Sequence, residues 1–227
     1  MNCTKVDMRS RGVWEHFTMS EGLPDMKIES IYEDSNNTLW IGTHDKGVVA
    51  FKEGVFQSFT VRDGLAGNGV YSIVEDEVGR LWFGTDRGLC FYFEEILTIC
   101  VEMEGVSFLW GGVRDQRGEL WFGVKGGVGA GVSVCNVIGQ TATLISLNEK
   151  GDDSGGINDI CEGNDGVLWC GGLGLYRIEE GYRVEFVLET MQMDIYSLMS
   201  DAAGFLWVSS NIGLYRYDTN NNHLKLI

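Results

Sequence analysis

The sequence predicts an all-β protein assembled from five copies of one four-stranded unit. A Leu-Trp pair recurs five times within one repeating frame, glycine is abundant while proline occurs once, and short alternating segments follow one another without a helical period. The 32 glycines beside a single proline favour many tight turns between short strands over a disordered chain.

The recurring pair sets the length of the unit. Its tryptophans are Trp40, Trp82, Trp121, Trp169 and Trp207, at intervals of 42, 39, 48 and 38 residues. A four-stranded propeller blade has about 40–50 residues. One such sheet has two apolar faces and cannot cover both alone, whereas blades stacked around an axis bury them. The predicted architecture is therefore a β-propeller of four-stranded antiparallel blades, five of them in this chain.

The first two strands of each unit form a hairpin of constant length. A residue nine positions before the tryptophan opens it in every copy: Ile31, Ile73, Gly112, Ile160 and Leu198. Between them lies a turn with Asp first and Asn or Gly three residues later, as in Asp76 and Gly79. Asp accepts backbone N–H bonds there and Gly supplies a positive φ. The fourth copy departs from the pattern, because Gly163 stands in place of the Asp.

The third and fourth strands follow at similar spacing. A Gly and an alternating segment come after the tryptophan strand, as at residues 47–51, and a more variable fourth strand is clearest at residues 55–60. Side chains alternate along a strand, so each tryptophan shares a face with the small residue two positions later. We interpret the five tryptophans as structural anchors that spread over the neighbouring sheet. Burial of one such side chain contributes about 2–3 kcal/mol before entropy.

The repeat boundaries do not determine whether the five blades close into a ring. Residues 1–10 are an N-terminal extension and residues 11–227 hold the repeats. The units span approximately residues 11–18 (an outer strand), 28–60, 70–102, 106–147, 156–188 and 194–227. Residues 13–18 align with the fourth strand at 55–60, yet the last unit has its own fourth-strand candidate at 223–227. We favour a section cut from a longer array; an independent five-bladed ring is the alternative.

Composition argues against several classes of function. The formal net charge is −16 and no run of Lys or Arg occurs, which disfavours nucleic acid and anionic membrane surfaces as partners. No stretch approaches the roughly 18–20 apolar residues of a membrane span, and the polar N-terminus lacks the apolar part of a secretory signal. The six cysteines form no C-x-x-C pair and have no His at ligand spacing, so we expect neither a metal site nor a cofactor.

Candidate ligand contacts lie in two sets of loops, which should emerge on the same face. These are the loops from strand four to the next strand one and those from strand two to strand three. Polar groups there would suit a small polar solute. The candidates are His44, Lys46, Asn68, Asp86, Arg87, Lys125 and Asn158; the alternative is that each is an ordinary turn residue. No pair of acids or Cys-His pair is brought together by the repeat, so we predict no catalytic residue.

The strings Ile31-Tyr32-Glu33-Asp34 with Leu39-Trp40-Ile41-Gly42-Thr43 carry a family resemblance. So do Asp63-Gly64-Leu65 and Leu81-Trp82-Phe83-Gly84-Thr85 in the second copy. They resemble the two-component regulator propeller repeat, which copies three to five match in degenerate form. The resemblance implies the extracytoplasmic sensory part of a hybrid histidine kinase or diguanylate cyclase, in some members a sensor of glycan-derived oligosaccharides, usually with seven-bladed rings.

The expected function is therefore a non-catalytic sensory or ligand-binding propeller that reads a small polar solute such as an oligosaccharide. The alternatives are a protein-interaction or dimerisation scaffold and, third, a propeller lyase or glycosidase. Kinase or cyclase output would come from a signalling domain or a partner kinase, because no phosphoacceptor box or nucleotide-binding glycine box occurs here. A periplasmic or extracytoplasmic location and a homodimer are further expectations, the first from the resemblance alone.

Overall fold

The computed structural model describes residues 15–102, 108–125, 133–147, 155–187, 190, 192–219, 221 and 223–227. Over these residues the chain forms five four-stranded antiparallel sheets, each a simple meander in which sequential strands pair. We call the sheets blades 1 to 5. The predicted all-β class and its five blades are confirmed. The described part contains no helix long and apolar enough to cross a membrane.

The strands of the first three blades are short and closely spaced. Blade 1 comprises β1 (Ile28–Glu33), β2 (Leu39–Thr43), β3 (Val48–Lys52) and β4 (Val55–Phe59). Blade 2 comprises β5 (Val70–Glu75), β6 (Leu81–Thr85), β7 (Gly88–Phe93) and β8 (Ile96–Glu102). Blade 3 comprises β9 (Phe108–Arg114), β10 (Leu120–Lys125), β11 (Ser133–Ile138) and β12 (Thr141–Ser146).

The last two blades repeat this pattern. Blade 4 comprises β13 (Ile157–Glu162), β14 (Leu168–Gly172), β15 (Gly174–Glu179) and β16 (Arg183–Val187). Blade 5 comprises β17 (Ile195–Ser200), β18 (Phe205–Ser210), β19 (Gly213–Asp218) and β20 (His223–Leu226). Blade 5 thus has its own outer strand, β20, which pairs with β19.

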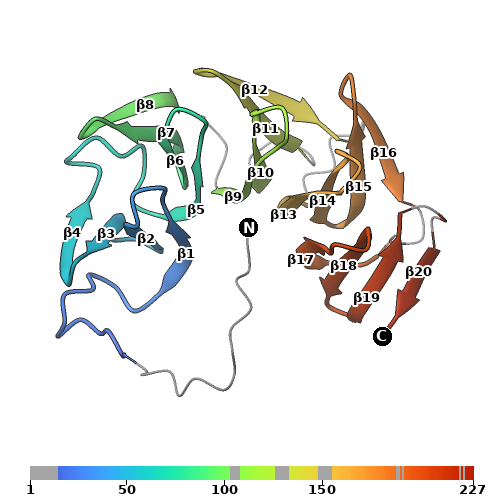
Figure 1. Cartoon of the computed structure of the whole chain (residues 1–227), viewed down its shortest axis with the longest axis horizontal. Coiled ribbons are helices and arrows are strands. Elements are labelled where there is room, and N and C mark those ends of the chain that lie inside the picture. Colours follow the sequence, from blue (N-terminus) through green and yellow to red (C-terminus); the bar gives the residue numbers. More distant parts are fainter. Residues whose placement is uncertain are drawn as a thin grey trace.

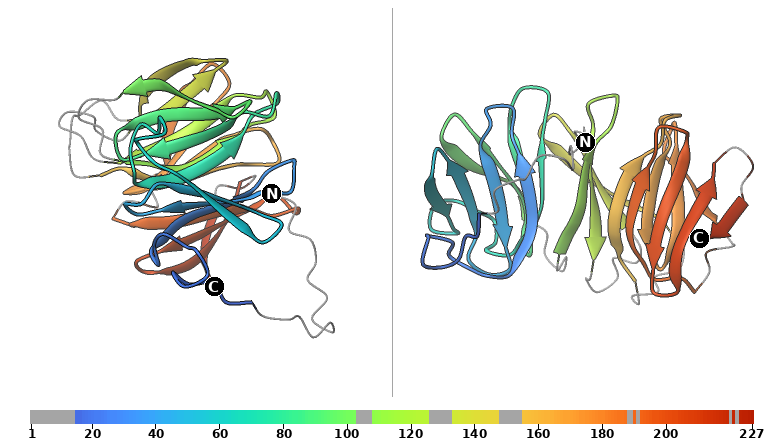
Figure 2. Two further views of the ribbon diagram at one scale, coloured as in Figure 1. Left: turned by 90° about the vertical axis from the view of Figure 1, so that its left-hand side faces the viewer. Right: turned by 60° about the horizontal axis from the view of Figure 1, so that its bottom comes forward.

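The blades stand side by side in an open arc (Figure 1). The first strand of each blade lies innermost and packs on the first strand of the next, from β1 through β5, β9 and β13 to β17. Blade 1 and blade 5 lie at opposite ends of the arc with a gap between them, which the second view in Figure 2 shows from another side. Within the described residues, no blade therefore covers the free face of blade 1 or that of blade 5.

In four of the five blades, the turn of the first hairpin is hydrogen-bonded to the tryptophan as well as to its own backbone. Asp76 Oδ1 accepts the N–H groups of Val78 and Arg80 at 3.0 and 2.9 Å, as the sequence predicts. Its other oxygen, Oδ2, accepts the indole N–H of Trp82 at 2.9 Å. The same indole bond recurs in blades 1, 3 and 5. An Asp six residues before the tryptophan therefore fixes the ring as well as the turn.

Blade 4 shows what the loss of that Asp does. Gly163 replaces it, and the backbone turn persists because Gly166 N still donates to Gly163 O at 3.0 Å. The indole N–H of Trp169, however, is buried and has no hydrogen-bond acceptor among the described residues. The Gly that sets this copy apart in the sequence therefore leaves a buried donor without an acceptor in the described part of the structure.

The frame tryptophans of blades 1 to 4 each face the next blade. Trp40 packs against Phe83 and Tyr92 of blade 2, with ring centroids 5.6 and 5.2 Å apart. The small residue two positions later also faces that blade, but the first strand of the next blade fills the space beside it rather than the indole. A Cβ on Gly42 would lie 2.4 Å from the carbonyl oxygen of Val70 on β5. The glycine permits this close backbone approach.

Candidate functional site

The loops that lead into the first strands and the loops between strands two and three lie on the same side of the blades, as the sequence predicts. The backbone N–H of His44, between β2 and β3, donates to Lys27 O at 3.1 Å, just before β1. Asp86 N bonds Gly69 O in blade 2, and Asn211 N bonds Asp194 O in blade 5, both at 3.0 Å. These loops lie along one side of the blades, where the first strands begin and the loops between strands two and three turn. We call this side the mouth.

A β-bulge lies at the mouth in the first strand of every blade. In four blades the pairing with strand two skips one residue: Glu29, Tyr71, Asn158 and Tyr196. In blade 3 the skipped residue is Gly111, directly after Trp110. A bulge leaves its residue out of the ladder and re-aims the side chain. Because the first strands are innermost, the bulges lie on the inner side of the arc, where the blades converge (Figure 1).

The blade 1 side of the mouth is charged. His44 Nδ1 lies 2.8 Å from Glu29 Oε1, and Lys27 Nζ lies 3.4 Å from the same oxygen. Lys27 Nζ is also 3.0 Å from His44 Nδ1. The His44 ring meets Tyr71 of blade 2 edge-on at 6.2 Å, which connects this group to the next blade.

The centre of the mouth is aromatic. Tyr71 stacks on Trp110 of blade 3 with centroids 5.0 Å apart and planes 25° from parallel. Phe108 meets Tyr71 edge-on at 4.9 Å. Burial, reinforced by the nearby carboxylates of Asp86 and Glu29, raises the pKa of Tyr71 to about 12. Its phenol therefore stays protonated at neutral pH. The buried indole N–H of Trp110 has no acceptor among the described residues.

A polar chain continues from the aromatic group to blade 5. Lys125 Nζ lies 5.4 Å from the ring centre of Trp110, at cation–π distance, and donates to Asn158 Oδ1 at 2.8 Å. Asn158 Nδ2 donates to the backbone oxygen of Ile195 at 2.7 Å and lies 3.4 Å from Asp194 Oδ1. Contacts thus run without interruption from blade 1 to blade 5, and we call this series the mouth arc.

The candidates chosen from the sequence divide between the mouth arc and its supports. His44, Lys125 and Asn158 belong to the arc. Lys46 and Arg87 are exposed beside it, and Lys46 Nζ lies 3.3 Å from Asp45 Oδ2.

Two other candidates hold the loops in place. Asn68 Oδ1 accepts the N–H of Val61 at 2.9 Å, and Asp86 Oδ1 accepts that of Gly69 at 3.1 Å. Whether any of the seven candidates binds a ligand stays a prediction.

Sequence reasoning missed Glu29, Tyr71, Trp110 and Tyr196, although a signal for them exists. Each lies 11 residues before the frame tryptophan of its blade, as does Asn158. The side chains at this position are acidic, aromatic and amide, whereas the frame around them is constant. In four blades this variable position is the bulged residue itself, and in blade 3 it directly precedes the bulged Gly111.

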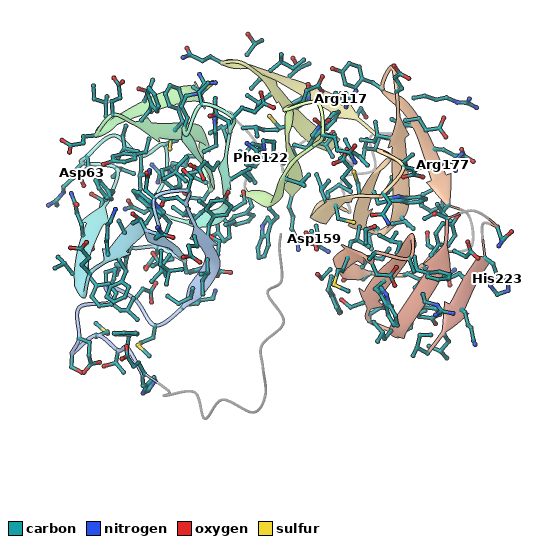
Figure 3. The ribbon with its side chains drawn as sticks, in the orientation of Figure 1. Asp63, Arg117, Phe122, Asp159, Arg177 and His223 are labelled. Carbon is teal, nitrogen blue, oxygen red and sulfur yellow. The ribbon has the colours of Figure 1, made fainter. Side chains whose placement is uncertain are left out.

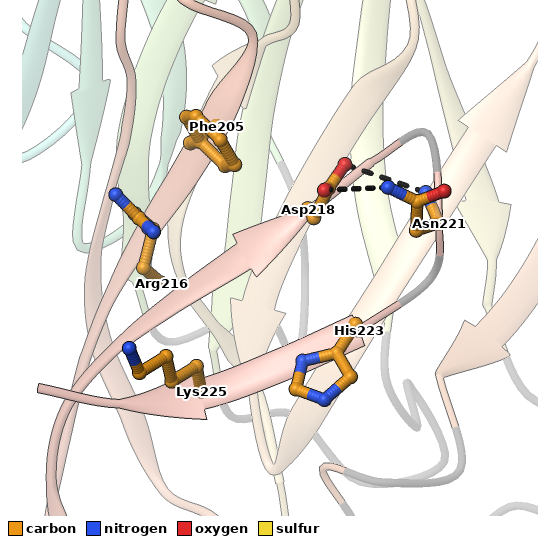
Figure 4. Close-up of a pocket in the computed structure, with 6 residues that line it drawn as sticks. All are labelled: Phe205, Arg216, Asp218, Asn221, His223 and Lys225. Carbon is orange, nitrogen blue, oxygen red and sulfur yellow. Dashed lines mark hydrogen bonds between the residues drawn. The ribbon is translucent and has the colours of Figure 1, made fainter.

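The pocket in Figure 4 lies elsewhere. Its volume is about 250 Å³ and it opens on the outward face of blade 5. Within it the Arg216 guanidinium carbon sits 4.3 Å from the Phe205 ring centre, and Asp218 accepts from Asn221 Nδ2 at 2.8 Å. The lining residues are Phe205, Arg216, Asp218, Asn221, His223 and Lys225. Figure 3 places His223 at the outer side of the arc, whereas Asp159 lies on its inner side.

The described cysteines are packing residues. Cys135 and Cys170 are fully buried, as their frame positions predict, and all five described cysteines carry free thiols. Burial raises the pKa of the Cys135 thiol to about 12, which disfavours the nucleophilic thiolate. Cys3 lies outside the described residues. Across the described part, no three His, Cys, Asp or Glu side chains are grouped to hold a metal ion.

Comparisons by sequence identify the repeat. The family model described as two component regulator propeller matches residues 22–45 and 64–87, which hold the entry segment and first hairpin of blades 1 and 2. The chain therefore carries two copies of this repeat, in the two units that the sequence resemblance singles out. No curated protein matches the chain by sequence.

Solved structures share the fold at low sequence identity. Virginiamycin B lyase from Staphylococcus aureus is similar with a TM-score of 0.72 and 15% identity, over 88% of this chain and 69% of the lyase. The extracellular domain of a putative hybrid two component system from B. thetaiotaomicron has a TM-score of 0.67 and 19% identity, over 84% of this chain and 27% of that one. A gluconolactonase from Xanthomonas campestris has a TM-score of 0.58 and 14% identity, over 88% and 75%.

Proposed function

Because the chain carries repeats of the two component regulator propeller, we propose that it is the non-catalytic sensory module of a two-component-type signal transduction protein. It binds a small polar solute such as an oligosaccharide at the mouth, and a signalling domain or partner kinase supplies the output. The likeness to the extracellular domain of a hybrid two component system supports this role. By the same analogy, we propose an extracytoplasmic location.

The observation that carries the proposal is the contrast between frame and mouth within one chain. The frame tryptophan is the same residue in all five blades, and in blades 1 to 4 it is buried against the next blade. Eleven residues earlier, the same backbone position presents Glu29, Tyr71, Trp110, Asn158 and Tyr196. Different side chains on a repeated scaffold are what recognition of an asymmetric ligand requires.

The chemistry of these side chains suits a sugar. Aromatic faces pack against the C–H face of a pyranose, while amide, carboxylate and ammonium groups bond its hydroxyls. Tyr196 is 54% exposed and free to serve as such a face. Lys125 and Asn158, already bonded to each other, present further donors and acceptors beside it.

Calorimetric titration with a panel of oligosaccharides tests the proposal. We expect at least one to bind, and Tyr196→Ala and Lys125→Met to weaken binding about tenfold each, equivalent to about 1.4 kcal/mol. Lys52→Met is the matched control and should leave affinity unchanged, because the Lys52 ammonium bonds Asn36 O in the β1–β2 turn, at the end of blade 1 away from the mouth. Absence of binding across the panel contradicts the proposal and favours the scaffold alternative.

A second candidate function rests on the His44–Glu29 pair. An imidazole 2.8 Å from a carboxylate can act as a general base, and this pair sits at the mouth beside Tyr71. The lyase and the lactonase show that this fold also serves enzymes. Chromatography of the same oligosaccharides after incubation separates the two functions. Products that disappear in His44→Gln would establish an enzyme, whereas unchanged sugars support the sensor.

A further inference from the structure

Residues 15–23 repeat the geometry of residues 57–65, which end blade 1 and lead into blade 2. The N–H and hydroxyl of Thr18 bond Glu21 Oε2, as those of Thr60 bond Asp63 Oδ2. Leu23 N bonds Thr18 O at 3.2 Å, as Leu65 N bonds Thr60 O at 3.2 Å.

The glycines and leucines of the two segments match as well. Gly22 and Gly64 have φ values of 115° and 110°. Leu23 and Leu65 are both buried. The same backbone path is thus followed twice.

Residues 57–65 show the structural role of this geometry, and residues 15–23 can be compared with them. Residues 57–59 are the end of β4 and pair with β3, where Phe59 is the partner of Val48. Residues 15–17 belong to no strand ladder within the described chain. Phe17 nevertheless packs on Phe51 of blade 1 with centroids 5.1 Å apart, as Phe59 packs on Tyr92 of blade 2 at 5.4 Å. Residues 15–17 therefore hold the place of an outer strand without the rest of its sheet.

The inner half of the same blade 1 face is open. Ile31 is 64% exposed, whereas its counterpart Ile73 is 6% exposed beneath blade 1. Glu33 is exposed, whereas Glu75 at the same position of blade 2 accepts the backbone N–H of Ser35 from the turn of blade 1 at 2.9 Å. The face thus displays the groups that bind a preceding blade elsewhere in this chain.

We infer that the occupant of this face is strands one to three of a further blade of the same repeat, and that residues 15–17 supply its fourth strand. Its third strand pairs with residues 15–17. Its tryptophan packs between Phe17 and Phe51, as Trp40 packs on Phe59 and Tyr92 at 5.7 and 5.2 Å. The backbone of its turn bonds Glu33. The interface is the one already present between blades 1 and 2.

Blade 5 of a second copy does not meet these requirements. It brings its own outer strand, β20, paired with β19 over four residues. That strand would occupy the place where residues 15–17 already lie. A three-stranded unit fits the face, and a complete four-stranded blade does not.

A fusion tests this directly. Residues 28–54, which carry β1 to β3 and the turn into β4, are placed directly ahead of Val13 in the otherwise intact chain, in place of residues 1–12. We expect the backbone amides of residues 15–17 to exchange at least about tenfold more slowly than in the unfused chain, and the unfolding midpoint to rise. The same fusion with the added tryptophan changed to Ala is the control and should lose most of both effects.

Exchange at residues 15–17 that is unchanged by the fusion overturns the inference. A second comparison does not depend on how the fusion folds. In the unfused chain, amides 15–17 should exchange at least about tenfold faster than amides 57–59, and equal protection would also overturn it. Protection of residues 15–17 that grows with protein concentration in the unfused chain would mean that a second copy is the occupant, against the inference.

Discussion

The interfaces between consecutive blades and the two faces at the ends of the arc use the same repeat positions but differ in burial. Leu175 on β15 is fully buried against blade 5, whereas Leu214 at the matching place on β19 is 45% exposed. Trp169 is buried, whereas Trp207 is only partly so. The frame sequence therefore specifies the blade, and the neighbouring blade decides whether a frame residue is core.

The largest expected effect separates Trp82 from Trp207. Both donate their indole N–H to the turn Asp, at 2.9 and 2.8 Å, but only Trp82 lies between two blades. We expect Trp82→Ala to lower the free energy of unfolding by about 3–5 kcal/mol. Trp207→Ala should lower it by about 1 kcal/mol, because less surface is lost from the core. Chemical denaturation measures both, and equal losses would remove the distinction between interior and end faces.

Overpacking sharpens the same comparison. A Cβ on Gly84 would lie 2.8 Å from Leu109 O of blade 3 and 2.2 Å from Ser72 Oγ, so Gly84→Ala should cost about 1–3 kcal/mol. Ser209 holds the equivalent position on the open face of blade 5 and already carries a side chain. Ser209→Ala should change the unfolding free energy by less than about 0.5 kcal/mol. A larger loss at Ser209 than at Gly84 would refute this assignment of faces.

The orphaned donor of blade 4 predicts a stabilising substitution. Gly163→Asp restores the residue that accepts the indole N–H in the other four blades, and it should raise the unfolding free energy by about 1 kcal/mol. In the opposite direction, Asp76→Ala should orphan Trp82 and cost about 1–3 kcal/mol. If Gly163→Asp destabilises the protein while Asp76→Ala does not, the indole bond is not part of the frame.

The smallest expected effect is on pH dependence, at the interface of blades 4 and 5. Asp159 accepts the N–H of Leu198 at 2.8 Å and the hydroxyl of Ser197 at 2.9 Å, and burial raises the pKa of its carboxyl. The folded state therefore binds a proton more tightly than the unfolded state. Its contribution to stability is full below the ordinary pKa of 3.8 and is lost as the pH rises through the raised value.

Asp159→Asn should accordingly flatten the fall in unfolding free energy as the pH rises above 3.8. Asp201, at the turn of blade 5, has the opposite sign. The indole N–H of Trp207 lowers the pKa of its carboxyl, so its contribution is lost as the pH falls. Wild-type and Asp159→Asn curves that remain parallel over this range would show that Asp159 does not titrate differently on folding.

Sequence periodicity was sufficient for the strands and their order, because the hairpin before the tryptophan has the same length in every copy and the tryptophans recur at blade-sized intervals. It also located the loops of the mouth. It could not show the bulges, since a bulge depends on the pairing of two strands and Tyr71 or Trp110 alone looks like an ordinary strand residue. The sequence did not predict the Asp76–Trp82 bond either. An Asp at this turn position is already accounted for by the backbone N–H groups that it accepts, so nothing pointed to a second partner.

Hydrogen exchange of the indole N–H groups tests the central claim most directly. If neighbouring blades bury the frame tryptophans, the indole protons of Trp40, Trp82 and Trp121 should exchange slowly and that of Trp207 should exchange much faster, although all four bond a turn Asp. Equal rates at all four positions would contradict the account, since the local hairpin alone would then determine protection.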